Sequence, residues 1–273
     1  MPPDPDGRPA PSAPHAAALF VYPFKSAGGI GVSEVEVDAV GLRDDRRWMA
    51  VDEHGRFVSQ RPRPQMALLR TRLLADALEL TAADRGPLRL PRAEPDAARF
   101  GSHRVWFSDR YTVDCGDDAA RWMSDFLGLP SRVMRAVRPG GQPPLTDDGH
   151  VRAGFADASP ALVVSTASLA ELNRRLDLPL PMDRFRPNIV VAGFGPFEED
   201  RWGARRVGEV RTRGGKPCPR CATTLVDQST GERGLEPLRT LATFRRNPAG
   251  EVEFGVNVFF ETGGVVRVGD PIG

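Results

Sequence analysis

Short apolar runs separated by turn residues make up most of the first half of the chain. Residues 19–24 form an apolar run rich in strand-forming side chains. Residues 47–51 and 56–59 predict the two strands of a hairpin, with Gly55 at the flexible turn position. Further short apolar runs continue from residue 66 to residue 113, each ended by turn residues. So many short strands indicate a barrel-like β domain.

Two segments have the period of amphipathic helices. In residues 117–127 the apolar side chains fall on one face, acidic residues open the segment, and Gly128 follows its end. A second helix is expected after a short buried strand at residues 161–164, where Ser168 and Glu171 have the spacing of a capping box. The sequence therefore predicts a β-rich α+β fold with few short helices.

Stretches rich in proline and glycine divide the chain. Residues 1–16 are rich in Pro and Ala and lack apolar periodicity, so we expect a disordered tail. Residues 138–150 have the composition of a linker. We therefore predict a first domain at residues 17–137 and a second domain at residues 151–273.

Composition and charge exclude several classes of partner. The 273-residue chain is 40% hydrophobic and 27% charged, which is typical of a soluble globular protein. Its net charge of +1 gives no single-sign field for nucleic acid or anionic membrane. The apolar run near the N-terminus is far shorter than the ~20 residues of a membrane helix, and no secretion signal precedes it. From the charge and the short apolar run, we expect a protein that binds neither nucleic acid nor membrane. Three cysteines fit a reducing compartment, so we expect it to be cytoplasmic.

The spacing of Cys218 and Cys221 is shared by zinc sites, redox dithiols and buried thiols. A structural zinc needs four ligands, and the sequence has no second pair to complete the set. A redox dithiol would begin a helix, whereas residues 222–226 form a β-branched run that predicts a strand. Lys216 precedes the motif and Arg220 lies between its two cysteines, and their charge favours the thiolate that binds soft metals. One or both thiols are thus candidate metal ligands, with two inert buried cysteines as the alternative. We expect Cys115 to be a buried structural residue. The remaining candidate ligands are histidines scattered along the chain, namely His15, His54, His103 and His150.

A second stretch has the composition of an anion-binding loop. Lys25 and Ser26 follow the apolar run at residues 19–24, and Gly28 and Gly29 let backbone N–H groups approach an anion closely. The loop is not a Walker A motif, since an alternating strand pattern rather than a helix follows it. A plain hairpin loop is the alternative.

Two further polar clusters are candidates for facing a ligand. Asp45 and Arg46 belong to a run of two acids and two arginines, which is either a solvated ion cluster or a phosphate-binding strand edge. Arg186 and Asn188 are expected on the same side of a starting strand, because side chains alternate there. For this second pair, a salt bridge and a turn hydrogen bond are the alternative.

Together, these stretches resemble one known family. The motifs occur in the family's order across residues 17–273, as Tyr22-Pro-x-Lys25-Ser26, Asp45-Arg46-x-Trp48, Arg186-Pro-Asn188-Ile, Cys218-x-x-Cys221 followed by Thr223, Val226 and Asp227, and Glu236-Pro-Leu. In these motifs the chain resembles the MOSC family, the molybdenum cofactor sulfurase C-terminal domain, together with the family's usual N-terminal β-barrel domain. Three residues, Ala158, Pro219 and Val256, depart from the usual Thr, Ser and Gln, so hydrogen bonds there are expected to be lost or rerouted.

The resemblance implies a fold, a cofactor and a set of site residues. The two domains would be an N-terminal β-barrel-like domain and a MOSC β-barrel domain, with a molybdenum cofactor (molybdopterin) in the cleft between them. Cys221 would ligate molybdenum, and Asp157 would be a catalytic group near the open metal position. The implied cofactor contacts are Lys25, Ser26, Arg46, Asp157, Ser159, Arg186, Asn188, Arg220, Cys221 and Asn257.

The resemblance also implies an activity. Relatives of this kind reduce N-hydroxylated compounds such as hydroxylamines, amidoximes and N-hydroxy bases by two electrons, without pyridoxal phosphate. Because the chain ends at Gly273 without a Cys-rich ferredoxin domain, we expect a separate electron-transfer partner, a flavin or iron–sulfur reductase. Two alternatives stay open. One is a persulfide carrier or cofactor-handling module, and the other is a β-barrel binding domain with inert thiols.

Overall fold

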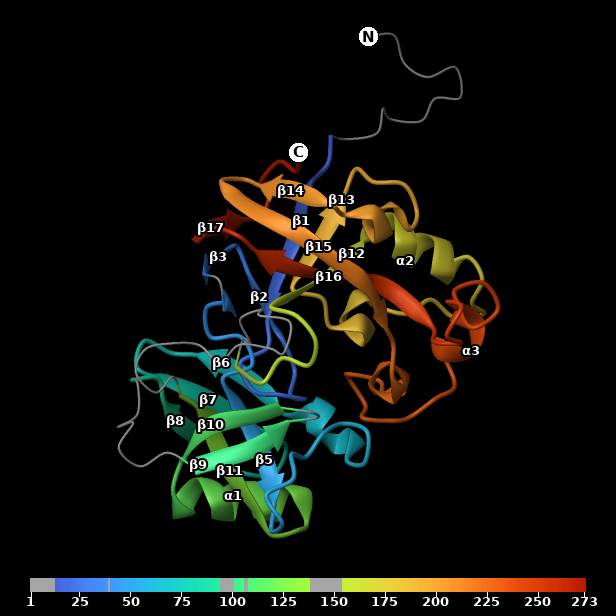
Figure 1. Ribbon diagram of the computed structural model, residues 1–273. Helices are drawn as coiled ribbons and strands as arrows, with labels where there is room; N and C mark the ends of the chain where they lie inside the picture. Colours follow the sequence, from blue (N-terminus) through green and yellow to red (C-terminus); the bar gives the residue numbers. More distant parts are fainter. Residues whose placement is uncertain (1–12, 39, 94–100, 106–107, 138–153) are drawn as a thin grey trace, which may run out of the picture.

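Two β-rich lobes make up the part of the chain that the computed structural model describes, residues 13–38, 40–93, 101–105, 108–137 and 154–273 (Figure 1). The described residues contain four sheets and three short α-helices, α1 (Asp117–Leu127), α2 (Thr166–Asn173) and α3 (Leu238–Leu241). This confirms the predicted β-rich class with few short helices. Within the described ranges, no helix has the length and apolar character needed to cross a membrane. The predicted linker and most of the predicted tail lie outside these ranges.

The upper lobe of Figure 1 is built on a seven-stranded sheet. The central strand β12 pairs in parallel with β13, and β1 adds antiparallel to the other edge of β13. Strand β1 begins at His15, so it includes the last two residues of the predicted tail. In spatial order the strands are β14 (Ala204–Val207), β15 (Val210–Pro219), β16 (Glu253–Phe260), β12 (Ala161–Ser165), β13 (Ile189–Ala192), β1 (His15–Val21) and β2 (Ile30–Val32).

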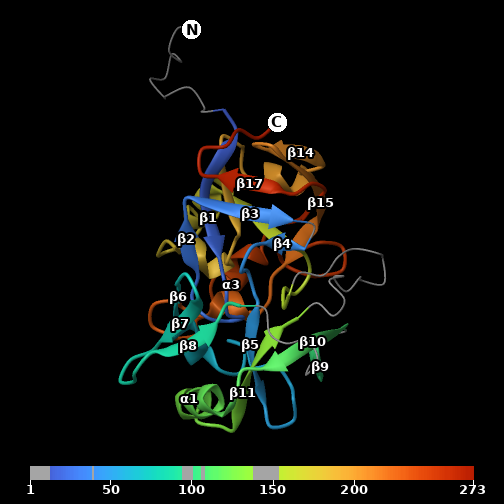
Figure 2. The same ribbon diagram turned by 90° about the vertical axis from the view of Figure 1, so that its left-hand side faces the viewer.

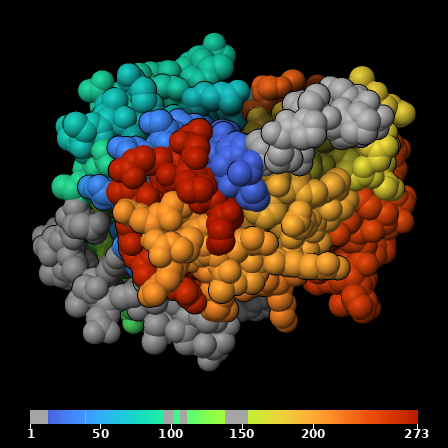
Figure 3. Space-filling model, turned by 90° about the horizontal axis from the view of Figure 1, so that it is seen from above, coloured from blue at the N-terminus to red at the C-terminus, as the bar shows by residue number. Residues whose placement is uncertain are grey.

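The first strands of the chain pair with its last ones. A three-stranded sheet joins β17 (Gly264–Arg267), β3 (Glu34–Asp38) and β4 (Gly41–Leu42). The N–H of Ala16 donates to the carbonyl oxygen of Asp270 at 2.9 Å. Seen from above, the blue N-terminal residues lie between red C-terminal residues and gold residues of the C-terminal half (Figure 3). Strands from both ends of the sequence therefore build the upper lobe, and the chain crosses to the lower lobe after β4.

The lower lobe contains two smaller sheets, and α1 packs against β11 and lies at the bottom of this lobe (Figure 2). Helix α1 has the predicted bounds, and Gly128 ends it in a left-handed conformation with φ of 68°. The predicted hairpin is present as β5 with a bridge from Val51 to Phe57. The sheets are β5 (Trp48–Asp52), β11 (Ser131–Ala136), β10 (Ser108–Asp114) and β9 (Gly101–Val105), and β6 (Arg70–Leu73), β7 (Ala77–Thr81) and β8 (Leu88–Pro91).

Helix α2 begins earlier than the predicted capping box. Ser165 is the N-cap, and its side chain accepts the N–H groups of Ala167 and Ser168. The Ser168 hydroxyl instead donates to the Glu199 carboxylate at 2.7 Å. Glu199 is fully buried, and burial raises its pKa above the usual range although Ser168 and the Ser165 N–H oppose this shift. The capping-box prediction was wrong because the nearby carboxylate competes for Ser168.

Candidate functional site

A cavity of about 330 Å³ takes its lining from both halves of the sequence. It brings together every residue that the sequence analysis singled out as a site residue. These are Lys25, Ser26, Arg46, Asp157, Ser159, Arg186, Asn188, Arg220, Cys221 and Asn257. Their individual roles stay predictions, and what the structure adds is that all ten line one cavity.

The backbone is strained at three of these positions. Ser26, Arg46 and Arg186 have φ of 69°, 48° and 54°, in the left-handed region that costs a non-glycine residue about 1–2 kcal/mol. The N–H of Arg46 donates to Tyr22 O at 2.8 Å, which holds the strained turn in place. Arg186 precedes β13 in a turn, so the prediction that it shares a strand with Asn188 was wrong. Strain of this kind concentrates at functional sites.

Positive charge dominates the cavity wall. Five cationic side chains line it, and Asp157 supplies the one carboxylate among the lining residues. The Lys25 ammonium pairs with Asp157 and donates to Phe155 O at 3.0 Å. Burial lowers the pKa of Lys25 below its usual range, although Asp157 opposes this shift. The cations are Lys25, Arg46, Arg61, Arg186 and Arg220. Such a wall suits a ligand with a multiply charged anionic group.

Tyr22 holds two of the guanidinium groups. The guanidinium carbon of Arg186 lies 4.3 Å from the centre of the Tyr22 ring, and that of Arg46 lies 5.0 Å from it. Burial raises the pKa of Tyr22, so its hydroxyl stays protonated, and it donates to Pro187 O at 3.1 Å. Tyr22 therefore orients both arginines by cation–π contact.

Asn188 is saturated by protein partners. Its amide nitrogen donates to Phe20 O at 3.2 Å and to Asp45 Oδ1 at 3.1 Å. Its oxygen accepts from Arg46 Nη1 and from the Leu162 N–H, both at 3.2 Å. With an exposed fraction of 1%, Asn188 acts by positioning Arg46 rather than by offering hydrogen bonds to a ligand.

Ser159 and Asn257 form a second polar contact on the wall. Ser159 Oγ lies 2.9 Å from Asn257 Oδ1 and 2.7 Å from Ala161 O. The amide nitrogen of Asn257 donates to Lys216 O at 3.2 Å. This contact ties the segment after Asp157 to β16 and to the strand that carries Cys218.

Cys221 begins a 3₁₀ turn at residues 222–225, so the strand predicted there was wrong. Burial by itself would raise the pKa of the Cys221 thiol. Hydrogen bonds from the Thr223 hydroxyl and backbone N–H, together with the charges of Arg61 and Arg220, outweigh burial and lower that pKa. The thiolate of Cys221 is thus favoured by the site, as a soft metal requires of its ligand.

The two residues that flank the thiols behave differently. Arg220 Nη1 donates to Cys218 Sγ at 3.2 Å, and Nη2 donates to Phe185 O at 2.7 Å. Arg220 Nε is buried and has no hydrogen-bond partner in the described residues. Lys216 is exposed and does not line the cavity. The second positive charge that favours the Cys221 thiolate is therefore that of Arg61, which is distant in the chain, and not that of Lys216.

The donor set fits a metal that arrives with its own ligands. Within the described ranges, no group of three or more His, Cys, Asp or Glu side chains is placed to hold a metal ion. The cavity offers a thiolate-favouring cysteine and a cationic wall. These groups match an anionic organic cofactor that supplies most of the metal's ligands.

Sequence reasoning missed one wall of the cavity. Phe57, Ser59 and Arg61 line it, from a segment recognised only as the second strand of a hairpin. Phe57 and Ser59 lie in the predicted strand, whereas Arg61 lies in the turn at residues 60–62 that follows it, so strand alternation alone did not place Arg61. Tyr22 and Thr223 were also missed as site residues, although both belong to the motifs that carry the resemblance.

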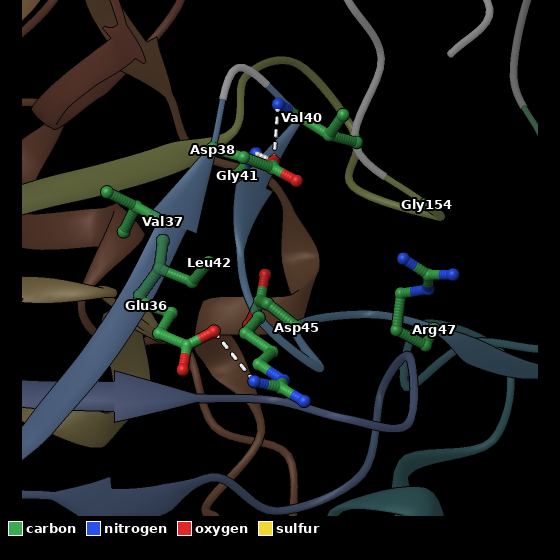
Figure 4. Close-up of a pocket in the computed structure, with 10 residues that line it drawn as sticks. Glu36, Val37, Asp38, Val40, Gly41, Leu42, Asp45, Arg47 and Gly154 are labelled. Atoms are coloured by element: carbon green, nitrogen blue, oxygen red, sulfur yellow. Dashed lines mark hydrogen bonds and ion pairs between the residues drawn. The ribbon is translucent and has the colours of Figure 1, made fainter. Parts of the chain in front are cut away.

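Two other hollows contain none of the predicted cofactor ligands. One, of about 230 Å³, lies against the β3–β4 hairpin, and Asp45, Arg47 and Gly154 also line it (Figure 4). Its polar groups bond locally, since Asp38 accepts the N–H of Val40 and Glu36 pairs with Arg43 at 2.6 Å. The other, of about 830 Å³, is a more open hollow beside α1. The lining of the first hollow mixes carboxylates with arginines, and that of the second holds five carboxylates and two arginines, so neither has a cationic wall like that of the site cavity.

Fold and site together define a protein with a MOSC domain and its N-terminal barrel domain. Residues 14–130 match the MOSC N-terminal beta barrel domain, and residues 150–273 match the MOSC domain. The chain belongs to this family.

Named relatives extend the likeness along nearly the whole chain. The chain is 34% identical over 280 residues to mitochondrial amidoxime reducing component 2 of Homo sapiens, covering 94% of this chain and 82% of the relative. It is 36% identical over 274 residues to mitochondrial amidoxime-reducing component 1 of Mus musculus, covering 94% and 81%. Among solved structures, the YuaD protein from Bacillus subtilis is 10% identical with a TM-score of 0.43, covering 96% of this chain and 94% of that one. That last likeness is too distant to carry an argument.

Proposed function

We propose that this protein is a molybdenum-cofactor-dependent reductase of N-hydroxylated compounds. The observation that carries the proposal is the meeting of Cys221 with five cationic side chains in one cavity. The names of the relatives support the substrate class, since they are called amidoxime-reducing components. Hydroxylamines, amidoximes and N-hydroxy bases are the substrates we expect.

In this proposal Lys25, Arg46 and Arg186 bind the cofactor's phosphate and pterin. Lys25 and Arg186 have exposed fractions of 5% and 9%, so the charges they present are little screened by water. Cys221 is the protein's sulfur ligand to molybdenum. Ser26, Ser159, Asn188, Arg220 and Asn257 complete the wall as contacts or as positioning residues.

When bound, the cofactor supplies the two electrons that break the N–O bond, with two protons taken up and water released. Asp157 is the residue we propose for moving protons. Its side chain is 57% exposed at the cavity edge while Lys25, its partner, is buried. The carboxylate therefore meets both solvent and cavity, as a proton relay must. The electrons come from a separate flavin or iron–sulfur protein.

A persulfide carrier is the second candidate function. The observation that favours it is the Arg220 guanidinium on Cys218 Sγ at 3.2 Å, which would stabilise a sulfur anion there. In that case Cys218 rather than Cys221 would bear the transferred sulfur, and the protein would carry no molybdenum.

The decisive experiment measures molybdenum and pterin per chain. The protein is expressed in hosts able and unable to make molybdopterin, with Cys221→Ser and the matched control Cys218→Ser. We expect metal and pterin only from the competent host, loss of molybdenum in Cys221→Ser, and retention in Cys218→Ser. Equal, negligible metal in both hosts, with persulfide on Cys218 by mass spectrometry, would support the carrier instead.

A further inference from the structure

A pair of glutamine side chains joins the two halves of the cavity wall from behind. Gln60 and Gln228 lie 168 residues apart in sequence and have exposed fractions of 0% and 6%. Gln60 Nε2 donates to Gln228 Oε1 at 3.0 Å, and Gln228 Nε2 donates to Gln60 Oε1 at 3.1 Å. The second N–H of each amide reaches a backbone carbonyl, Ser26 O at 2.8 Å and Val226 O at 2.9 Å. All four amide N–H groups therefore have acceptors.

Each end of the pair holds a residue of the cavity. Ser26 belongs to the predicted cofactor loop, and its carbonyl is fixed by Gln60. Gln228 Oε1 also accepts from Arg186 Nη1 at 3.4 Å, while the same nitrogen donates to Ala27 O at 2.6 Å. The pair thus touches the cofactor loop on one side and a cavity guanidinium on the other.

Gln60 also holds the segment that forms the Phe57, Ser59 and Arg61 wall of the cavity. Phe57, Ser59 and Arg61 face the cavity, and Gln60 points the opposite way, toward Gln228. Behind this segment, Arg233 Nη2 donates to the carbonyl oxygens of Gln60, at 3.5 Å, and of Arg61. The Gln60 side chain and the two carbonyl groups next to the Arg61 side chain therefore all have hydrogen-bond partners that hold this segment in place.

Burial alone does not require amides at these two positions. Two leucines would fill a similar volume, and their contact would have no preferred direction. Reciprocal hydrogen bonds fix the relative position of the two segments, because buried polar pairs tolerate few alternative alignments. The use of two glutamines therefore indicates that the alignment of the two segments matters.

We propose that Gln60 and Gln228 are positioning residues that set the spacing of the Ser26 loop, Arg186 and Arg61 around the cofactor. This inference rests on the proposed function. Neither glutamine lines the cavity, so the pair acts only through the residues it holds, Ser26 and Arg186.

A double-mutant cycle tests the pair. Gln60→Leu, Gln228→Leu and the double variant are compared with Gln65→Leu, whose amide donates to Leu127 O at 3.5 Å away from the cavity. Two readouts are taken for each. The first is the Tm of chain from a host without molybdopterin. The second is the rate at which holoprotein loses molybdenum and pterin during timed incubation.

The expected pattern separates positioning from folding. Each single variant leaves a buried amide unsatisfied, so its Tm falls by about 3–8 °C. The double variant recovers the part of that Tm loss that comes from one amide facing a leucine, and not the part that comes from Ser26 O and Val226 O losing their donors. It and both single variants lose cofactor about tenfold faster than the parent. Gln65→Leu loses cofactor at the parental rate.

Two results would overturn the inference while leaving the proposed function intact. One is parental cofactor retention in all three variants, and the other is retention that recovers with Tm in the double variant. A parent protein without molybdenum or pterin would overturn both the proposed function and this inference.

Discussion

Replacing Arg46 by methionine removes the positive partner of Asp45, a carboxylate whose side chain is 3% exposed. The methionine keeps an apolar stem against Tyr22, and the left-handed backbone at this position is equally strained in both proteins. Removing one member of a buried ion pair costs about 3–5 kcal/mol. Asp45 keeps the N–H of Tyr22 at 2.8 Å and the amide of Asn188 at 3.1 Å. We therefore expect a loss near the lower bound, about 3 kcal/mol.

The assay is urea-induced unfolding of cofactor-free protein, so that cofactor binding does not enter the free energy of unfolding. Arg43→Met is the matched control, because Arg43 pairs with Glu36 at 2.6 Å while both side chains are more than 60% exposed. An exposed pair contributes about 0–1 kcal/mol, so this control should unfold near the parental urea concentration.

The double variant Asp45→Asn with Arg46→Met tests the cause. A neutral amide needs no cation, so most of the loss should return. The reasoning is refuted if Arg46→Met costs no more than Arg43→Met. It is refuted equally if the double variant is no more stable than Arg46→Met alone.

Three further predictions follow from the same structure. In cofactor-free protein at about pH 8, iodoacetamide should alkylate Cys221 well before Cys115, because burial raises the pKa of Cys115 to about 12. Equal rates by mass spectrometry would contradict this. Glu199 has a raised pKa in the folded state, so the stability tied to its protonated form is present below about pH 4.3 and is lost as pH rises through the folded pKa. Glu199→Gln should therefore gain stability relative to the parent from acid toward neutral pH in urea titrations, and a constant difference would count against it. Arg61→Gln should lower kcat/KM for an amidoxime about tenfold, whereas Arg63→Gln on the same segment should not. Similar values for the two would place Arg61 outside the reaction.

Local sequence signals predicted helix α1 correctly. Its apolar period, its acidic first turn and Gly128 all act within a few residues, so no distant contact was needed to define it. The motifs around Lys25, Arg186 and Cys221 likewise identified residues that converge on one cavity. Their order along the chain, rather than any single spacing, carried that prediction.

Other local patterns failed where side-chain hydrogen bonds, local or distant, compete with the predicted element. The β-branched run after Cys221 predicts a strand, yet it forms a 3₁₀ turn whose Thr224 hydroxyl bonds back to Cys221 O at 3.0 Å. Ser168 bonds Glu199, 31 residues away, instead of capping its helix. The free energy that strand or helix propensity contributes is small, so hydrogen bonds and packing that contribute more decide such cases.

By itself, the sequence determined the β-rich class, the amphipathic helix and the residue types that an anionic, thiolate-ligated cofactor needs. Only the tertiary structure decided that β1 and β3 pair with strands of the C-terminal half, that Arg61 rather than Lys216 faces Cys221, and that Gln60 meets Gln228. The physical reason is that helix period and turn chemistry act within a few residues of chain. Charge and hydrogen-bond partners act through space, between segments that come together only when the fold closes.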